Sequence, residues 1–386
     1  MNVETFNYSL ESLPPFFYLN KRNEKNIYIF PTEKEALEFY NNFSNLVPKS
    51  SHFPAWDTLS YDSFTPSLEI QGKRLQTLHN ILVNGSFDIA MSMKSFAQKI
   101  FINDLDVIDL QIGQDVDFEN LIENLAYLGY VHKDRVESRG TFSIRGGQID
   151  IYPLNSENPK RIIFNGDEIV ELKLFDYITQ RSIENIKKVL ITPSSELFQI
   201  NQNDIYDSLE IESKKDLDEY ELFQFSQNLN NFKSLLDFVP DEVSINIIDF
   251  NSCKENFTEL QKLEENSFNN LQKYFSLKVS RMKSRYVDTF LDINKFETNF
   301  YATNNLESIR NVPQFLEGLS TDRVLQNISD LSKVYLSSTN EKIKDKFSEI
   351  KNLQIVENSF SYSAVFPEMS IAVIDESLFT NRKQKD

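Results

Sequence analysis

The chain has 386 residues, too many for one ordinary domain, and 40% of them are hydrophobic, including 32 Phe, which excludes global disorder. The net charge of −18 argues against a dedicated nucleic-acid binder, because such proteins usually carry a basic face. With one cysteine, Cys253, and three histidines, an internal disulfide is excluded and a zinc site is not expected. No leader peptide opens the sequence and no apolar run approaches the ~18 residues of a membrane helix. We therefore expect a cytoplasmic protein without membrane contact, metal or cofactor, and Cys253 as a small buried residue.

The first hundred residues alternate between strand and helix patterns. Residues 26–30 are a short apolar run of β-forming residues, which predicts a buried strand. Thr32 and Glu35 then form a capping box ahead of apolar residues at helical spacing. A second helical face at residues 75–82 and a second buried strand at 87–91 follow. This pattern predicts an open, mainly parallel α/β sheet.

The pattern changes near residue 107. Residues 117–128 predict a short amphipathic helix that ends at Gly129. Asn165-Gly166 predicts a hairpin with a type I′ turn, in which both central residues have positive φ. Alternating runs predict a small antiparallel sheet, with strands at 141–144, 147–152, 161–164 and 168–174. Residues 131–187 contain nine basic and nine acidic residues, so the negative charge of the chain lies elsewhere.

The rest of the chain returns to α/β patterns. Residues 201–221 are polar and acidic, as in a loop or a surface helix. Residues 243–250 predict a buried strand that resumes the first sheet, and residues 254–278 predict a long helix. From about residue 312 a small α/β unit is expected, with strands at 334–336 and 370–375, a helix at 340–350, and a frayed tail at 380–386.

A phosphate-binding loop is missing from the sequence. Such a loop needs a Gly-rich turn followed by Lys and Ser or Thr, and none of the nine glycines precedes that pair. Gly72-Lys73-Arg74 comes nearest but lacks an upstream glycine and the hydroxyl. Asp375-Glu376 is similar to the acidic pair of a motor, but the start of a helix explains it better. We therefore expect no ATP hydrolysis.

Two groups of residues allow a functional or a structural interpretation. Trp56, Tyr61 and Phe64 suit stacking on bases or packing along one edge of the first sheet, and the negative charge favours packing. Arg145 and Arg161 are either solvated charges on a half-exposed sheet or anchors for a partner, since arginine pairs with carboxylates in a forked geometry. The residues alone leave both questions open.

Residues 53–66 and 143–153 together resemble one family, the bacterial transcription-repair coupling factors. The first stretch reads Phe-Pro-Ala-Trp-Asp-Thr-Leu-Ser-Tyr-Asp-Ser-Phe-Thr-Pro, and the second reads Ser-Ile-Arg-Gly-Gly-Gln-Ile-Asp-Ile-Tyr-Pro. The resemblance is to the N-terminal module of the family, which is built like the excision-repair protein UvrB. It implies a multidomain α/β chain: a degenerate RecA/P-loop-like domain at 1–106 with 193–300, an inserted α+β UvrA-binding domain at 107–192, and a small α/β third domain at 310–386.

The resemblance also implies a binding site. In this family the inserted domain binds UvrA, the damage sensor of nucleotide excision repair, and two arginines of that contact align with Arg145 and Arg161. The family commonly has a second Phe where this chain has Asn165, after Phe164. Losing that aromatic anchor would cost ~1–3 kcal/mol of binding free energy, so we expect weaker UvrA binding or an altered partner. Phe164 itself is expected in the core.

The implied function is that of a non-enzymatic adaptor, which binds UvrA and recruits repair to stalled RNA polymerase. RNA polymerase and DNA would be contacted only through C-terminal domains that follow this module in the family. The chain is accordingly expected to be a fragment or the product of a split or truncated gene. Two alternatives stay open: a UvrB-like ATP-dependent DNA-remodelling enzyme, and a purely structural or autoinhibitory module.

Overall fold

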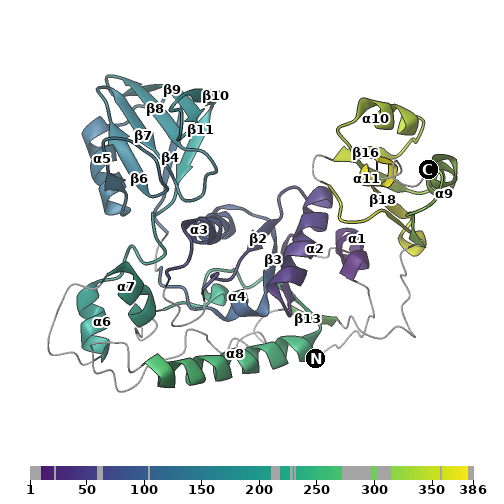
Figure 1. The fold of residues 1–386 in the computed structure, drawn as a ribbon, viewed down its shortest axis with the longest axis horizontal. Coiled ribbons are helices and arrows are strands. Elements are labelled where there is room, and N and C mark those ends of the chain that lie inside the picture. Colours follow the sequence, from purple (N-terminus) through teal and green to yellow (C-terminus); the bar gives the residue numbers. More distant parts are fainter. Residues whose placement is uncertain are drawn as a thin grey trace.

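Three larger sheets and one two-stranded sheet organise the part of the chain that the structure describes (Figure 1). None of the helices in that part is long and apolar enough to cross a membrane. The computed structural model describes residues 10–20, 23–58, 64–102, 105–209, 218–226, 229, 232–271, 297–301, 314–356 and 359–380.

The first sheet has five strands in the order β13-β12-β1-β3-β2, and every neighbouring pair is parallel. The predicted parallel sheet is therefore confirmed, as is the return of the chain to this sheet near residue 244. The strands are β1 (Lys25–Phe30), β2 (Ser51–Phe53), β3 (Phe87–Ser92), β12 (Ser244–Ile248) and β13 (Glu297–Tyr301).

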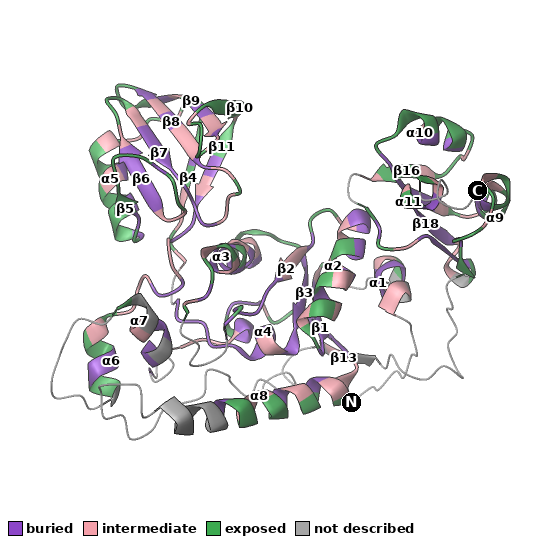
Figure 2. Ribbon diagram, in the orientation of Figure 1, coloured by how far each residue is buried: buried purple, intermediate pink, exposed green. Residues whose placement is uncertain are grey.

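Helices cover both faces of this parallel sheet. Alternate residues of β1 face opposite sides, so Ile27 and Tyr28 belong to two different cores. Burial on both faces explains the nearly continuous apolar strands (Figure 2). The side of Ile27 packs against α3 (Leu68–Val83), α4 (Met93–Ala97) and α8 (Phe250–Leu271), and the side of Tyr28 packs against α1 (Leu13–Asn20) and α2 (Glu33–Leu46).

The helices of this region largely match their prediction. The capping box of α2 is confirmed, because Thr32 Oγ1 accepts from the Glu35 amide at 3.3 Å and the Thr32 amide donates to Glu35 Oε2 at 3.1 Å. On α3, Leu82 is 51% exposed and so lies outside the buried face to which it was assigned. Helix α8 begins at Phe250 rather than Lys254, and its predicted end at 272–278 lies outside the described residues. Cys253 is buried, as expected.

The second sheet has six strands in the order β10-β9-β8-β7-β6-β5. All neighbours are antiparallel except β5 and β6. The predicted strands are confirmed, and so is helix α5 (Phe118–Tyr127), which follows its cap Asp117 and ends before Gly129, whose φ is 85°. The strands are β5 (Val131–His132), β6 (Thr141–Ile144), β7 (Gln148–Ile151), β8 (Lys160–Asn165), β9 (Glu168–Phe175) and β10 (Ser182–Ile186). A separate antiparallel pair, β4 (Ile108–Gln111) and β11 (Lys188–Ile191), shares the core of this sheet.

The hairpin between β8 and β9 differs from its prediction. Asn165 pairs with Glu168, so the two-residue loop is Gly166-Asp167. Within this loop φ is positive at Gly166 (64°) and not at Asp167, and it is not positive at Asn165 either. The prediction of a type I′ turn at Asn165-Gly166 is therefore wrong, and the φ pattern is that of a type II′ turn. The sequence signal located the hairpin one residue too early because Asn165 continues the strand.

The polar segment 201–221 is more than a surface loop. It contains α6 (Gln202–Leu209) and the start of α7 (Glu219–Ser226), while residues 210–217 lie outside the described residues. Ile205 of α6 is fully buried in a cluster with Trp56. The two helices thus cover one edge of the first sheet.

The aromatic residues of the stretch 53–66 fall into different environments. Trp56 is 1% exposed and meets the ring of Phe223 edge-on at 5.3 Å between centroids. The packing interpretation is confirmed for Trp56. Phe64 is 74% exposed, and Tyr61 lies outside the described residues.

The third sheet has the order β14-β17-β18-β15-β16. Strand β15 is parallel to β16 and β18, whereas β17 is antiparallel to β18 and β14. The predicted small α/β unit is confirmed, although residues 381–386 of its tail lie outside the described residues. Its elements are β14 (Gln314–Phe315), α9 (Thr321–Ile328), β15 (Lys333–Ser337), α10 (Glu341–Phe347), β16 (Leu353–Val356), β17 (Ala364–Phe366), β18 (Ile371–Asp375) and α11 (Ser377–Thr380).

The third sheet packs against the first two helices of the chain. Asn42 Nδ2 of α2 donates to Ser361 Oγ at 2.8 Å, and the Ser361 amide donates back to Asn42 Oδ1 at 3.0 Å. Lys333 Nζ donates to Tyr18 Oη of α1 at 2.9 Å. Elements from the two ends of the chain therefore share an interface.

Candidate partner-binding face

The six-stranded sheet has two unlike faces, because side chains alternate along its strands. Ile149 of β7 and Ile162 of β8 are fully buried in the core with α5. Asp150 and Arg161 adjoin them in the sequence and so point to the other side, where they lie directly opposite each other in the strand register. We call this other side the charged face, and define it by Asp150, Arg161, Glu171 and Lys173.

Arg161 is held on the charged face by Asp150. Its Nε donates to Asp150 Oδ1 at 2.8 Å and its Nη2 donates to Asp150 Oδ2 at 2.9 Å. The Asp150 side chain is 1% exposed and that of Arg161 is 15% exposed. The guanidinium carbon also lies 4.7 Å from the ring centroid of Phe175. Hydrogen bonding to Asp150 raises the pKa of Arg161, and the forked pair fixes the orientation of the guanidinium.

Arg145 lies in the turn between β6 and β7. Its amide donates to Gln148 O at 2.9 Å and its carbonyl accepts from the Gln148 amide at 3.2 Å, with Gly146 at a φ of 59°. The exposed side chain donates from Nη2 to Asp134 O at 3.1 Å. No carboxylate among the described residues forms an ion pair with Arg145, so its charge faces solvent.

Asn165 is exposed at the end of β8, next to the Gly166-Asp167 turn. The residue before it, Phe164, is 8% exposed and meets Phe118 edge-on at 5.1 Å between centroids. The expectation that Phe164 belongs to the core is confirmed. A second aromatic ring at position 165 would point away from that core.

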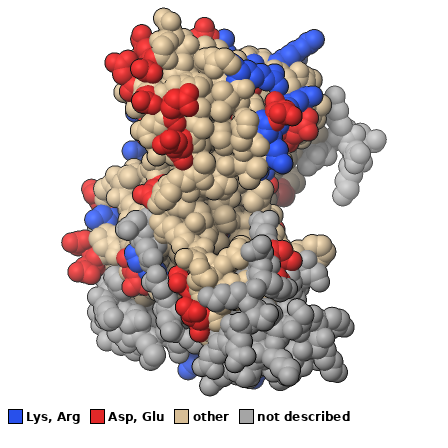
Figure 3. Space-filling model, turned by 90° about the vertical axis from the view of Figure 1, so that its left-hand side faces the viewer, with Lys and Arg blue, Asp and Glu red and all other residues tan. Residues whose placement is uncertain are grey.

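Two of the three residues singled out from the sequence lie at the same end of the sheet, and the third lies further along a strand. The turns that hold Arg145 and Asn165 are neighbours, because the Phe164 amide donates to Gly147 O at 2.8 Å. Arg161 lies further along β8, on the charged face. The structure thus brings Arg145 and Asn165 to the same end and sets Arg161 apart. In the view of Figure 3, most Lys and Arg of the upper part of the molecule lie toward its right-hand edge with some Asp and Glu among them, and further Asp and Glu lie on the left.

Sequence reasoning missed Asp150, the partner of Arg161. The signal was available, since opposite charges across adjacent strands are a favoured pair. The alternation in Gln148–Ile151 places Asp150 on the polar side of β7, and the strand register then places it opposite Arg161. The other basic residue of the charged face, Lys173, forms an ion pair with Glu171.

The positions considered for nucleotide or metal chemistry have structural roles. Gly72, the glycine that comes nearest to a phosphate-loop pattern, lies inside α3 and is buried. Asp375 Oδ1 accepts from the Ser377 amide at 3.0 Å at the start of α11, which confirms its role at a helix start. Among the described residues, no group of three or more His, Cys, Asp or Glu side chains is arranged to hold a metal ion.

Comparisons with known proteins add two findings. Residues 108–197 match the UvrB interaction domain. The chain is also similar to several transcription-repair-coupling factors. The Escherichia coli protein is 29% identical over 175 residues, which are 44% of this chain and 15% of that protein. The Bacillus subtilis protein is 34% identical over 149 residues, which are 38% of this chain and 13% of that protein.

A longer similarity is found with the Staphylococcus epidermidis transcription-repair-coupling factor, which is 29% identical over 251 residues, or 57% of this chain. These residues are 21% of that protein, so the matched part of the chain spans about a fifth of its relative or less. The match at 108–197 includes α5 and all six strands that carry the charged face. Residues 108–197 of the chain are therefore similar to the UvrB interaction domain, and the chain is similar to part of the transcription-repair-coupling factors.

Proposed function

We propose that this chain is the adaptor portion of a transcription-repair coupling factor and binds UvrA. The observation that supports this most directly is the pair of arginines within the matched domain. Arg145 has a solvent-facing charge, and Arg161 has a guanidinium oriented by Asp150. Arginines presented in this way suit recognition of carboxylates on a protein partner.

The three residues have different roles in this proposal. Arg145, exposed in a turn, supplies long-range attraction and a contact at the rim. Arg161 supplies an oriented contact at lower entropic cost, because its rotamer is already fixed. Asn165, in place of an aromatic anchor, limits the affinity.

We further propose that the chain is divided into a motor-like domain at 1–106 with 193–300, an inserted domain at 107–192 and a third domain at 310–386. The separate apolar cores of the three larger sheets support this division. The chain acts without ATP hydrolysis, and the missing phosphate loop supports that part of the proposal. RNA polymerase and DNA would be bound by the other parts of the longer relatives.

The test is a titration of the purified chain with UvrA from the same organism. Arg145→Ala is expected to weaken binding by roughly 1–2 kcal/mol. Because Arg145 forms no ion pair with the described residues, this loss reports on binding rather than on the stability of the fold. Arg181→Ala is the matched control, since Arg181 is exposed in the turn between β9 and β10, at the opposite end of the sheet. Equal affinity of Arg145→Ala and the unsubstituted chain would contradict the assigned site.

Arg161 needs a different variant. Arg161→Ala alone would leave the buried Asp150 carboxylate without its partner, so any loss of binding would be mixed with a loss of stability. The double variant Arg161→Gln with Asp150→Asn removes both charges and keeps a side chain that can form hydrogen bonds at both positions. It is expected to fold and to bind UvrA more weakly than the unsubstituted chain, and Asn165→Phe is expected to bind more tightly.

A further inference from the structure

The connection that follows β11, whose pair with β4 shares the core of the six-stranded sheet, is fixed on both sides. Toward the sheet, Tyr130 Oη donates to Thr192 O at 2.8 Å, and the Ser194 amide donates to Leu128 O at 2.9 Å. Toward the parallel sheet, the Glu196 amide donates to Gln71 Oε1 of α3 at 3.1 Å. We use the name joint for residues 192–197 and residues 154–155, together with the residues of α3 that contact them.

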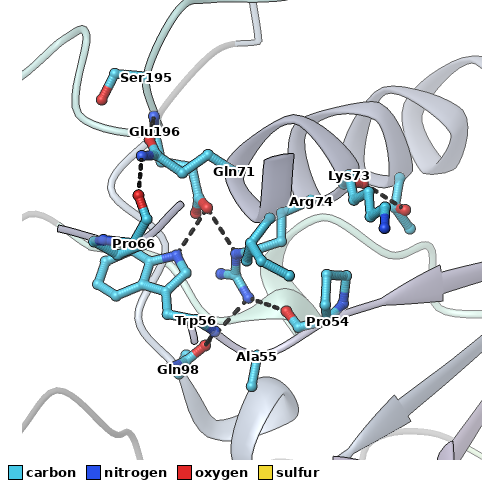
Figure 4. A network of polar contacts seen from close by, with 12 residues as sticks. Pro54, Ala55, Trp56, Pro66, Gln71, Lys73, Arg74, Gln98, Ser195 and Glu196 are labelled. Atoms are coloured by element: carbon cyan, nitrogen blue, oxygen red, sulfur yellow. Dashed lines mark hydrogen bonds and ion pairs between the residues drawn. The ribbon is translucent and has the colours of Figure 1, made fainter. Parts of the chain in front are cut away.

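Glu196 is the centre of a buried polar network (Figure 4). Its Oε1 accepts from Arg74 Nε at 2.8 Å and from Trp56 Nε1 at 2.8 Å. The Arg74 side chain is 0% exposed and the Glu196 side chain is 1% exposed. A buried ion pair therefore joins α3 to residues 192–197, which follow β11.

Arg74 connects this ion pair to the rest of the first sheet. Its Nη1 donates to Pro54 O at 2.9 Å and to Gln98 Oε1 at 3.3 Å. Its guanidinium carbon lies 4.3 Å from the ring centroid of Phe53, the last residue of β2. One side chain thus contacts β2, the segment after it and the end of α4.

A second contact brings α3 directly against the segment that follows β7. A Cβ atom placed on Gly72 of α3 would lie 2.1 Å from Leu154 O, in the segment after β7, so no other residue fits there without movement of the backbone. Next to it, Asn155 Nδ2 donates to Gln76 Oε1 at 2.7 Å. Leu154 itself is 2% exposed and belongs to the core of the parallel sheet.

The network contributes little net stability for the number of polar groups that it buries. Arg74 Nη2, Glu196 Oε2 and Gln98 Nε2 are buried without a hydrogen-bond partner among the described residues. Buried ion pairs with unsatisfied atoms are often no more stable than apolar side chains of similar size. What such a pair supplies, and apolar contacts do not, is a defined direction.

We infer that the joint is rigid, and that Arg74 and Glu196 are positioning residues that set the direction in which the charged face points. The six-stranded sheet and the parallel sheet then move together, and a partner bound on the charged face has a fixed orientation relative to the parallel sheet. This inference goes beyond the proposed function, because it concerns the joint and holds whichever protein binds.

The experiment measures the distance between two spin labels on the full chain. Cysteines replace Asn41 on α2 and Glu184 on β10, which are both exposed. The native Cys253 is buried, and burial raises the pKa of its thiol, so the labels attach to the introduced cysteines. A rigid joint predicts one narrow distance distribution.

Two variants test the positioning role. Arg74→Met with Glu196→Gln removes both buried charges at similar volume, and it is expected to keep the fold and the unfolding midpoint while broadening the distance distribution. Gly72→Ala is expected to shift the mean distance, whereas Gly85→Ala, where an added Cβ meets nothing within 4 Å, is the control that does not.

A distribution in the double variant as narrow as in the unsubstituted chain would overturn the inference, even if stability changed. Should the double variant fail to fold, Gly72→Ala decides alone, and an unshifted mean distance would overturn it. Neither outcome depends on UvrA, so failure of the inference and failure of the proposed function are distinguishable.

Discussion

Two arginine–carboxylate pairs of this molecule have the same chemistry in different surroundings. Arg74 and Glu196 in the joint are 0% and 1% exposed, whereas Arg161 and Asp150 on the charged face are 15% and 1% exposed. The first pair is surrounded by further polar and aromatic groups of the chain. The second leaves one side of the guanidinium to solvent. The difference indicates that the joint uses its pair to fix an orientation, and that the charged face uses its pair to present a charge.

The glycines of the two regions differ in the same sense. An added Cβ would lie 2.1 Å from Leu154 O at Gly72 in the joint, and 3.2 Å from Phe164 O at Gly147 beside the charged face. The first distance requires the backbone to move, and the second requires an adjustment of a few tenths of an ångström. The joint therefore tolerates less change than the face.

The largest expected effect comes from breaking the buried pair of the joint. Glu196→Ala removes the acceptor of Arg74 Nε and of Trp56 Nε1 and leaves the buried guanidinium charge without its carboxylate, and it is expected to lower the free energy of unfolding by ~3–5 kcal/mol. Urea unfolding followed by circular dichroism measures this, and the fluorescence of Trp56, the one tryptophan, reports on the joint. Arg161→Ala is expected to lower the free energy of unfolding by less. Equal losses in the two variants would contradict the difference between the two pairs.

The next effect comes from adding one carbon to each region. Gly72→Ala is expected to lower the free energy of unfolding by ~1–3 kcal/mol, as overpacking does. The atom that the new Cβ would meet, Leu154 O, belongs to the backbone, so it can move away only if the segment after β7 moves with it. Gly147→Ala is expected to lower the free energy of unfolding less. Chemical unfolding of the two variants, measured side by side, tests this order. A larger loss of stability for Gly72→Ala would support a tightly packed joint, and a larger loss for Gly147→Ala would contradict it.

A smaller effect distinguishes charge from orientation on the charged face. Asp150→Asn removes a negative charge beside Arg161, so a face that acts by charge alone would bind an acidic partner more tightly. A face that acts through the orientation of Arg161 would bind it more weakly, by about tenfold or ~1.4 kcal/mol. We expect the weaker binding, as measured by calorimetric titration with UvrA. Arg145→Ala in the same series tests the separate contact proposed for the turn between β6 and β7.

The smallest effect concerns a carboxylate that is less buried than either pair. Burial alone would raise the pKa of Glu33, but hydrogen bonds from His52, Ser92 and the Ala55 amide outweigh it and lower the pKa below its ordinary value of 4.5. Because the folded-state pKa is lowered, the carboxylate stabilises the fold above pH 4.5, and this contribution is lost as the pH falls through the lowered value.

The Glu33 side chain is 39% exposed, so solvent screening keeps this contribution small. Glu33→Gln is expected to flatten the acid side of the stability curve slightly, which unfolding midpoints at neutral and acidic pH would measure. An unchanged curve in the variant would show that the ionised Glu33 carboxylate adds nothing to stability.

The elements of the fold could be predicted wherever local patterns determine them. The buried run 26–30, the capping box of Thr32 and Glu35, and the helix end at Gly129 all depend on residues close in sequence. The Asn165-Gly166 pair located a hairpin for the same reason. It failed on the turn type because the register of β8 and β9, which local sequence does not determine, extends the strand to Asn165.

The joint and the partner of Arg161 could not be predicted in this way. Arg74 and Glu196 are 122 positions apart, and nothing local to either residue marks the other. A glycine inside a helix did give a signal at Gly72, since a conformationally costly residue there indicates close approach of another backbone. From the sequence, Gly72 was interpreted only as a possible part of a phosphate loop.

The strand order of the parallel sheet has a consequence for synthesis on the ribosome. Strand β1 lies between β3 and β12, and β12 lies between β1 and β13, so the sheet cannot be completed until residues 244–248 and 297–301 have left the ribosome. The six strands between residues 131 and 186 need no later residues to pair. The six-stranded sheet can therefore fold first, although it is made second, while the apolar strand β1 has β3 on one side and no partner yet on the other. An unpaired apolar strand edge favours aggregation, so this is the interval in which the nascent chain is most prone to it.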